Sequence, residues 1–234
     1  GRFVAESDGQ PLTWRTKKAK ELFACLLHQE GKGMDKRSLI FRLWPEASEK
    51  NGSTLFNTTI SYLRRTLMAS AASEVLIVRD RRYFLNMDFI DSDYRRLEQA
   101  AELAKSNQLD QIEDIQEFLG LYQGDYFGTE DYRWLMEQRE YVEQLFLRTA
   151  RKLAKYRAKI GDYEGAAAVL GRVLEIDEGS VSTLQELLRY RVAAGDMNGA
   201  RRQYEKLKQG EAWEEELDQD FMTFLNMREE EEDA

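Results

Sequence analysis

The stretch NTTISYLRRTL, residues 57–67, combines helical spacing with residue types that favour helices poorly. Its apolar positions would form one buried stripe: Phe56, Ile60, Leu63 and Leu67. The opposite side and its flanks carry side chains that can bond bases or phosphates: Thr54, Asn57, Thr58, Ser61, Tyr62, Arg64 and Arg65. Such a face suits the major groove of double-stranded DNA, although an ordinary solvated helix face with surface arginines is the alternative.

Two other basic features favour the DNA interpretation. Lys17 and Lys18 would lie in the first turn of a helix, where cations oppose the helix dipole. A bound phosphate near that helix end would make them favourable. The segment RDRR, residues 79–82, would place three arginines, Arg79, Arg81 and Arg82, in a short turn, where Asn-Gly types serve a tight hairpin better.

The charge is distributed unevenly along the chain. The formal net charge of the 234 residues is −9. Residues 1–90 carry 15 Lys and Arg against 10 Asp and Glu, whereas residues 91–234 carry 19 against 33. A basic module joined to an acidic one is therefore expected, and the basic module is the one that could bind nucleic acid.

The elements expected in residues 1–90 are three helices followed by a hairpin. A short strand pair around the SDGQ turn precedes a helix capped by Thr16. A second helix is capped by Asp35 and stopped by Pro45, and the third runs from about Ser53 to Met68. VLIV and YFL would form the hairpin. This order predicts a winged helix-turn-helix DNA-binding domain, with the third helix in the major groove and the hairpin on the adjacent backbone or minor groove.

Residues 91–228 are expected to form an all-helical domain. GDYEGAAAVL from Gly161 and GDMNGARRQY from Gly195 repeat Gly, Asp, Gly and Ala at an offset of 34 residues. That period is typical of tetratricopeptide-like helix pairs, whose apolar faces are buried by stacking. Such a module can bind proteins or serve only as a scaffold. Residues 229–234 would form an acidic, solvated tail. The fold class predicted is thus mainly α.

Catalytic, metal-binding and cofactor-binding patterns are missing from the sequence. His28 is the single histidine, and no Gly-rich phosphate loop occurs. The single cysteine, Cys25, lies at core spacing. We therefore expect no enzyme activity, no catalytic residue, no cofactor and no metal. Cys25 is expected to be a buried, inert thiol that cannot form an internal disulfide, and a cytoplasmic location fits this. No apolar run is long enough to cross a bilayer, so no membrane partner is expected.

Several motifs in order resemble SARP-type bacterial transcriptional activators, whose DNA-binding domain is OmpR-like. The matching positions are Trp14, Arg15, Lys18 and Ala19, then Leu43, Trp44 and Pro45, then Ile60, Leu63, Arg64 and Leu67. The segments FIDSDYRRLEQAAELA, GLYQGDYF and WLMEQREYVEQLFLRTARKLA resemble the bacterial transcriptional activator domain. The resemblance implies promoter binding and recruitment of RNA polymerase. By analogy, the loop from Pro45 to Asn51, with Glu46, Glu49 and Lys50, would touch polymerase, or is a plain surface loop.

The chain also departs from the family pattern. Family members usually have a Gly before the Tyr of the wing, where this chain has Arg82 before Tyr83. The usual LG-x-x-P segment near the end is absent. Compact members often follow a receiver domain, and the start at Gly1 would fit the effector part of a two-component response regulator.

The sequence thus predicts a transcriptional activator that binds promoter DNA in a sequence-specific manner. A homodimer is compatible with this prediction. The alternative is a helical-repeat interaction scaffold whose winged helix does not bind DNA. The predicted DNA-binding set is Arg15, Lys17, Lys18, Thr54, Asn57, Thr58, Ser61, Tyr62, Arg64, Arg65, Arg81 and Arg82.

Overall fold

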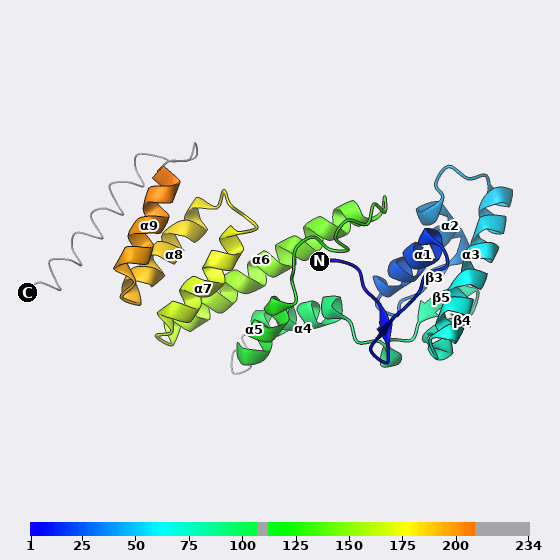
Figure 1. Cartoon of the computed structure of the whole chain (residues 1–234), viewed down its shortest axis with the longest axis horizontal. Helices are drawn as coiled ribbons and strands as arrows, with labels where there is room; N and C mark the ends of the chain where they lie inside the picture. Colours follow the sequence, from blue (N-terminus) through cyan, green and yellow to red (C-terminus); the bar gives the residue numbers. More distant parts are fainter. Residues whose placement is uncertain (107–111, 209–234) are drawn as a thin grey trace, which may run out of the picture. The chain divides into compact units, whose positions relative to one another are not determined.

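The computed structural model describes residues 1–106 and 112–208. The described residues form two compact units, one from residues 1–98 and 121–143, the other from residues 99–106, 112–120 and 144–208. The structure is mainly helical, with short antiparallel hairpins followed by helices (Figure 1), which confirms the predicted fold class. The sequence-based division at residue 90 stays a prediction, and the acidic tail, residues 229–234, lies outside the described residues.

The winged helix-turn-helix order predicted for the first unit is confirmed. Its helices and strands up to residue 90 are β1 Glu6–Ser7, β2 Gln10–Pro11, α1 Lys17–Leu27, β3 Met34–Asp35, α2 Lys36–Leu43, α3 Glu49–Ala69, β4 Leu76–Arg79 and β5 Arg82–Leu85. Two short 3-10 turns, Ser73–Val75 and Met87–Phe89, flank the β4–β5 hairpin. The three-stranded antiparallel sheet has the order β3-β5-β4. β3 was not predicted, because two residues are too few to show an alternating pattern.

Both predicted caps hold their helices. The Thr16 hydroxyl accepts from the Ala19 amide at 3.1 Å, and the Asp35 carboxylate accepts from the Ser38 amide at 3.0 Å. Each cap satisfies an amide that the first helical turn leaves free. The carboxylate's hydrogen bonds to Ser38 hold the pKa of Asp35 below its ordinary value.

The predicted start of the third helix was wrong. α3 begins at Glu49 rather than about Ser53, so the loop expected from Pro45 to Asn51 ends at Ser48. The segment EASEKNG was expected to be a connecting loop, but Gly52 is buried inside the helix, and a Cβ there would collide with the Ile40 side chain. Gly52 therefore serves the close approach of α2 and α3.

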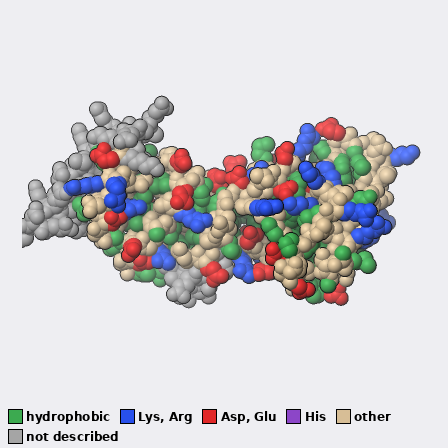
Figure 2. Space-filling view, viewed as in Figure 1, with side chains coloured by type: hydrophobic (Ala, Val, Ile, Leu, Met, Phe, Trp, Pro, Cys, Tyr) green, Lys and Arg blue, Asp and Glu red, His purple; other side chains and the backbone are tan. Residues whose placement is uncertain are grey.

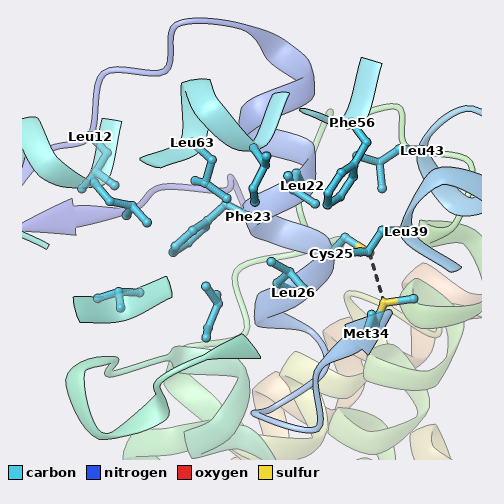
Figure 3. Packing of buried hydrophobic residues seen from close by; sticks show 14 residues of the cluster. Leu12, Leu22, Phe23, Cys25, Leu26, Met34, Leu39, Leu43, Phe56 and Leu63 are labelled. Carbon is cyan, nitrogen blue, oxygen red and sulfur yellow. Dashed lines mark hydrogen bonds between the residues drawn. The ribbon is translucent and has the colours of Figure 1, made fainter. Parts of the chain in front are cut away.

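One hydrophobic core joins α1, α2, α3 and the sheet (Figure 3). Leu22 and Leu39 are fully buried in it, as is Cys25. The Cys25 thiol lies 3.8 Å from the Met34 sulfur, and burial raises the pKa of the thiol to about 11. The prediction of a buried cysteine is confirmed.

Residues 121–143 add an aromatic cluster to the first unit. The His28 ring, at the end of α1, lies 5.4 Å from the Tyr94 ring, 5.9 Å from Tyr126 and 6.0 Å from Trp134, between centroids. Its Nδ1 is buried and makes no hydrogen bond with a described residue. Burial, with smaller contributions from Arg42 and Lys32, lowers the pKa of His28 from 6.5 to about 4.

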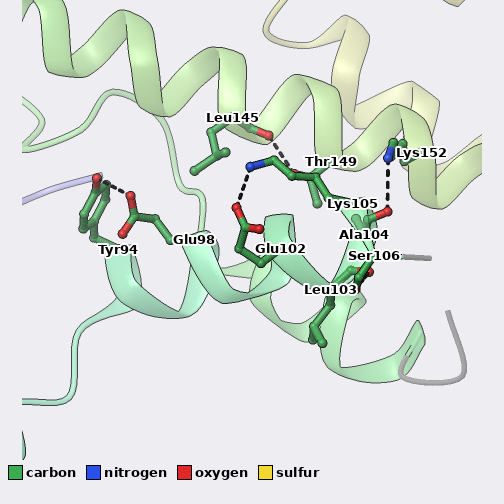
Figure 4. A network of polar contacts seen from close by, with 10 residues as sticks. All are labelled: Tyr94, Glu98, Glu102, Leu103, Ala104, Lys105, Ser106, Leu145, Thr149 and Lys152. Atoms are coloured by element: carbon green, nitrogen blue, oxygen red, sulfur yellow. Dashed lines mark hydrogen bonds and ion pairs between the residues drawn. The ribbon is translucent and has the colours of Figure 1, made fainter. Parts of the chain in front are cut away.

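The second unit contains α5 Ile112–Gly120, most of α6 Leu135–Lys159, α7 Tyr163–Leu174, α8 Val181–Ala193 and α9 Met197–Lys208. It also contains the C-terminal part of α4 Asp93–Lys105, where the Lys152 ammonium of α6 donates to the Ala104 carbonyl at 3.2 Å (Figure 4). A lysine that donates to a carbonyl at the C-terminal end of a helix stabilises that end, because its positive charge interacts favourably with the helix dipole.

The 34-residue repeat builds the same corner twice. Asp162 caps α7 by accepting from the Gly165 amide, and Asp196 accepts from the Gly199 amide in α9. Each aspartate also pairs with an arginine five residues before it, Arg157 and Arg191. A Cβ at either Gly165 or Gly199 would collide with its arginine–aspartate pair, which explains the repeated glycine.

Replacement of Gly165 by Ala is expected to disturb this corner. Gly→Ala in a helix normally stabilises by up to about 1 kcal/mol, but here the new Cβ must displace the Arg157–Asp162 pair and strain the cap. Gly171→Ala, in the same helix with open space around it, is the matched control. Urea unfolding should rank Gly165→Ala at least about 1 kcal/mol below Gly171→Ala. Equal stabilities would contradict the account of the corner.

Protonation of His28 should destabilise the first unit. Because its pKa is lower in the folded protein, the unfolded chain binds more protons between pH 6.5 and about 4. The free energy of unfolding should therefore fall as the pH drops through this window, by at most about 1.4 kcal/mol per pH unit from this group. His28→Phe keeps an aromatic ring and removes the titration. Unfolding curves from pH 7 to 4 should show a shallower pH dependence for the variant, and parallel curves would refute this role.

Candidate nucleic-acid interface

α3 presents the two faces expected from its sequence. The stripe residues Phe56, Ile60, Leu63 and Leu67 are no more than 6% exposed. Six polar side chains line an open hollow on the helix's other side: Thr54, Asn57, Thr58, Ser61, Tyr62 and Arg65. Arg64 is exposed but does not line the hollow. Six of the seven residues predicted for this polar face are thus brought together on one accessible surface.

The start of α1 contributes to the same side of the unit. The Arg15 guanidinium lies 4.9 Å from the centroid of the Tyr62 ring, a distance typical of cation–π contact. Lys17, the next cation, is exposed. Arg15 is therefore placed next to the hollow of α3.

Lys18 is engaged within the protein. Its ammonium donates to the Leu43 carbonyl at 2.7 Å and pairs with Glu21 at 2.7 Å. Glu21 is only 5% exposed, and burial raises the pKa of its carboxyl group. The hydrogen bond and the charge of Lys18 lower this pKa and so partly offset the effect of burial. Lys18 thus ties α1 to the end of α2, a role that helical spacing did not indicate.

The wing places one arginine at its tip. Asp80 and Arg81 both have left-handed backbone, with φ of 51° and 61°, as a two-residue type I′ hairpin requires. Arg81 is exposed. Arg82 is also exposed, but it donates to the Gly33 carbonyl at 2.7 Å and so holds the hairpin against the segment before β3. The two arginines of this turn therefore have different environments.

Sequence reasoning missed Lys36. Its ammonium donates to the Ser53 hydroxyl at 2.7 Å and to the Asn57 side-chain oxygen at 3.0 Å. It also lies 5.6 Å from the centroid of the Phe56 ring. Lys36 is the first residue of α2, far from α3 in sequence, and no local pattern links the two.

The residues predicted to contact polymerase lie at the start of α3 and just before it. Glu46 is in the loop and pairs with Arg133 at 3.0 Å, both side chains being exposed. Glu49 and Lys50 lie in the first helical turn and are exposed. An exposed pair of this kind contributes little stability, so Glu46 remains accessible to another partner.

The arrangement suits a polyanion better than a small molecule. Lys and Arg side chains are exposed over the region of α1–α3 (Figure 2).

Across residues 1–106 and 112–208, no group of three His, Cys, Asp or Glu is placed to hold a metal ion. Within the same ranges, no helix is long and apolar enough to span a bilayer.

Comparisons with known proteins identify the family. Residues 92–234 match the family model described as the bacterial transcriptional activator domain. No curated protein sequence gives a significant match. Among solved structures, Mycobacterium tuberculosis EmbR, in complex with a low affinity phosphopeptide, shares 15% identity and a TM-score of 0.67. The match covers 95% of this chain and 63% of that one, and it shows a common fold.

The family match covers well over half of the chain. The predicted resemblance of these residues to the bacterial transcriptional activator domain is confirmed, and the chain belongs to the family of proteins that contain this domain.

Proposed function

We propose that this chain binds double-stranded promoter DNA in a sequence-specific manner and activates transcription. The observation that carries the proposal is the exposed face of α3, where six side chains suited to bases and phosphates line one hollow. A helix-turn-helix places such a face in the major groove. Family membership supports a role in transcription.

The remaining cations would contact the DNA backbone. Arg15 lies against Tyr62 of α3, Lys17 is exposed at the start of α1, and Arg81 would reach the neighbouring backbone or minor groove from the wing. Arg64 is exposed on the flank of the same helix. Lys18 and Arg82 already have partners in the protein, so we assign them smaller contributions.

The family also suggests recruitment of RNA polymerase. Glu46 and Glu49 would offer carboxylates to a basic surface of polymerase, with Lys50 beside them. The helical domain would serve dimerisation, regulation or partner binding, and a homodimer on promoter DNA is compatible with this proposal.

The second candidate function is an interaction scaffold without DNA binding. The excess of acidic residues after residue 90, 33 against 19 basic ones, favours it. The two candidates differ in what the surface of α3 does, so DNA binding distinguishes them directly.

Arg65→Ala should weaken binding to the cognate promoter about 10-fold or more, because an arginine–guanine pair contributes about 1–3 kcal/mol. A mobility-shift titration measures the change. Arg189→Ala removes an equal charge from an exposed position of α8 and should leave the affinity within about 2-fold. Equal affinities of the wild type and Arg65→Ala for the promoter would contradict the assignment of α3 as the helix that contacts the bases.

A salt titration of the same complex separates DNA binding from the scaffold function. Neutralisation of about five phosphates predicts a slope of log affinity against log salt near −4 to −5. A flat response in the wild type would favour the scaffold.

The polymerase contact is tested separately. The double variant Glu46→Gln, Glu49→Gln should lower activated transcription in vitro about 3-fold or more at saturating DNA occupancy, since charges at the rim of an interface steer association. Glu74→Gln, also exposed, is the control for loss of a carboxylate. Full activation by the double variant would exclude these carboxylates from the contact.

A further inference from the structure

The ammonium of Lys36 occupies a defined position on the side of α3. It donates to Ser53 at 2.7 Å and to Asn57 at 3.0 Å, and it lies 5.6 Å from the ring centroid of Phe56. Two hydrogen bonds and a ring contact fix the end of an otherwise flexible side chain. Lys36 is half-buried, unlike the exposed Arg37 that follows it.

This contact determines how the Asn57 amide is oriented. A lysine ammonium has three donors and no acceptor, so the oxygen of Asn57, not its nitrogen, must face Lys36. The amide group is planar, and its NH₂ therefore points away from Lys36. Asn57 also lines the hollow of α3, so what it offers there is mainly a hydrogen-bond donor.

Adenine and guanine make different demands on such a side chain. Asparagine bonds adenine bidentately only when its oxygen accepts from N6 and its nitrogen donates to N7. Guanine presents two acceptors, N7 and O6, and thymine presents O4. Lys36 takes one of the two lone pairs of the Asn57 oxygen and places its positive charge 3.0 Å from that oxygen. This charge disfavours the N6 donor of adenine and favours the acceptors of guanine or thymine, whereas the Asn57 NH₂ keeps its ability to donate.

We propose that Lys36 is a positioning residue that makes Asn57 a donor, so that the base facing Asn57 is guanine or thymine rather than adenine. The inference rests on the proposed function and extends it to a base preference. Lys36 itself acts through Asn57 and would not contact the base.

The test is selection of binding sites by the full chain from a pool of duplexes with randomised bases. Asn57→Ala identifies the base position that depends on Asn57, because its preference there disappears. At that position the wild type should disfavour adenine. Lys36→Met, which keeps an apolar stem over Phe56 and removes the ammonium, should raise adenine relative to guanine about 5-fold or more.

Two control variants separate positioning from loss of charge. Lys36→Arg retains a donor-only group and should keep the wild-type preference. Lys17→Met removes an exposed cation from the same unit and should lower affinity at every site without changing the base preference.

The outcomes distinguish this inference from the proposed function. A Lys36→Met variant that loses affinity uniformly, like Lys17→Met, overturns the positioning role, as does a wild type that prefers adenine at the Asn57 position. A wild type that enriches no sequence overturns the proposed function and the base preference together. The predicted shift toward adenine in Lys36→Met, with none in Lys36→Arg, supports both.

Discussion

The burial of one side of α3 is the constraint on which the candidate interface depends. Phe56 and Leu63 are completely buried, and Ile60 and Leu67 nearly so, which fixes the rotation of the helix on the core. A rotation that exposed these residues would forfeit about 1.5–3 kcal/mol for each large side chain. The polar face is therefore held toward solvent by the hydrophobic effect, and Gly52 allows α2 to approach the same helix closely.

Local patterns in the sequence were sufficient for much of this architecture. The stripe of α3, the caps at Thr16 and Asp35 and the β4–β5 hairpin each depend on residues close together in the chain. The six residues of the hollow could be grouped from helical spacing alone. The one local prediction that was wrong is the start of α3, because Gly52 lies inside the helix and allows close packing instead of forming a loop.

Contacts between distant residues could not be read from the sequence. Lys18 and Arg82 were predicted to bind DNA because of their charge and position. In the structure, each donates to a backbone carbonyl of another segment. Lys36 carried no local signal although it contacts two residues of α3. The same limit applies to the repeat, where Gly and Asp were visible but the arginine that makes the glycine necessary was found only in the structure.

The central claim is that α3 enters the major groove with its polar face. Dimethyl sulfate footprinting of the complete chain on its promoter measures this most directly, because the reagent methylates guanine N7 in the major groove. The account predicts protection of guanines within the bound site, and loss of binding when those guanines are methylated beforehand. Bound DNA whose guanine N7 atoms react as in free DNA would contradict it.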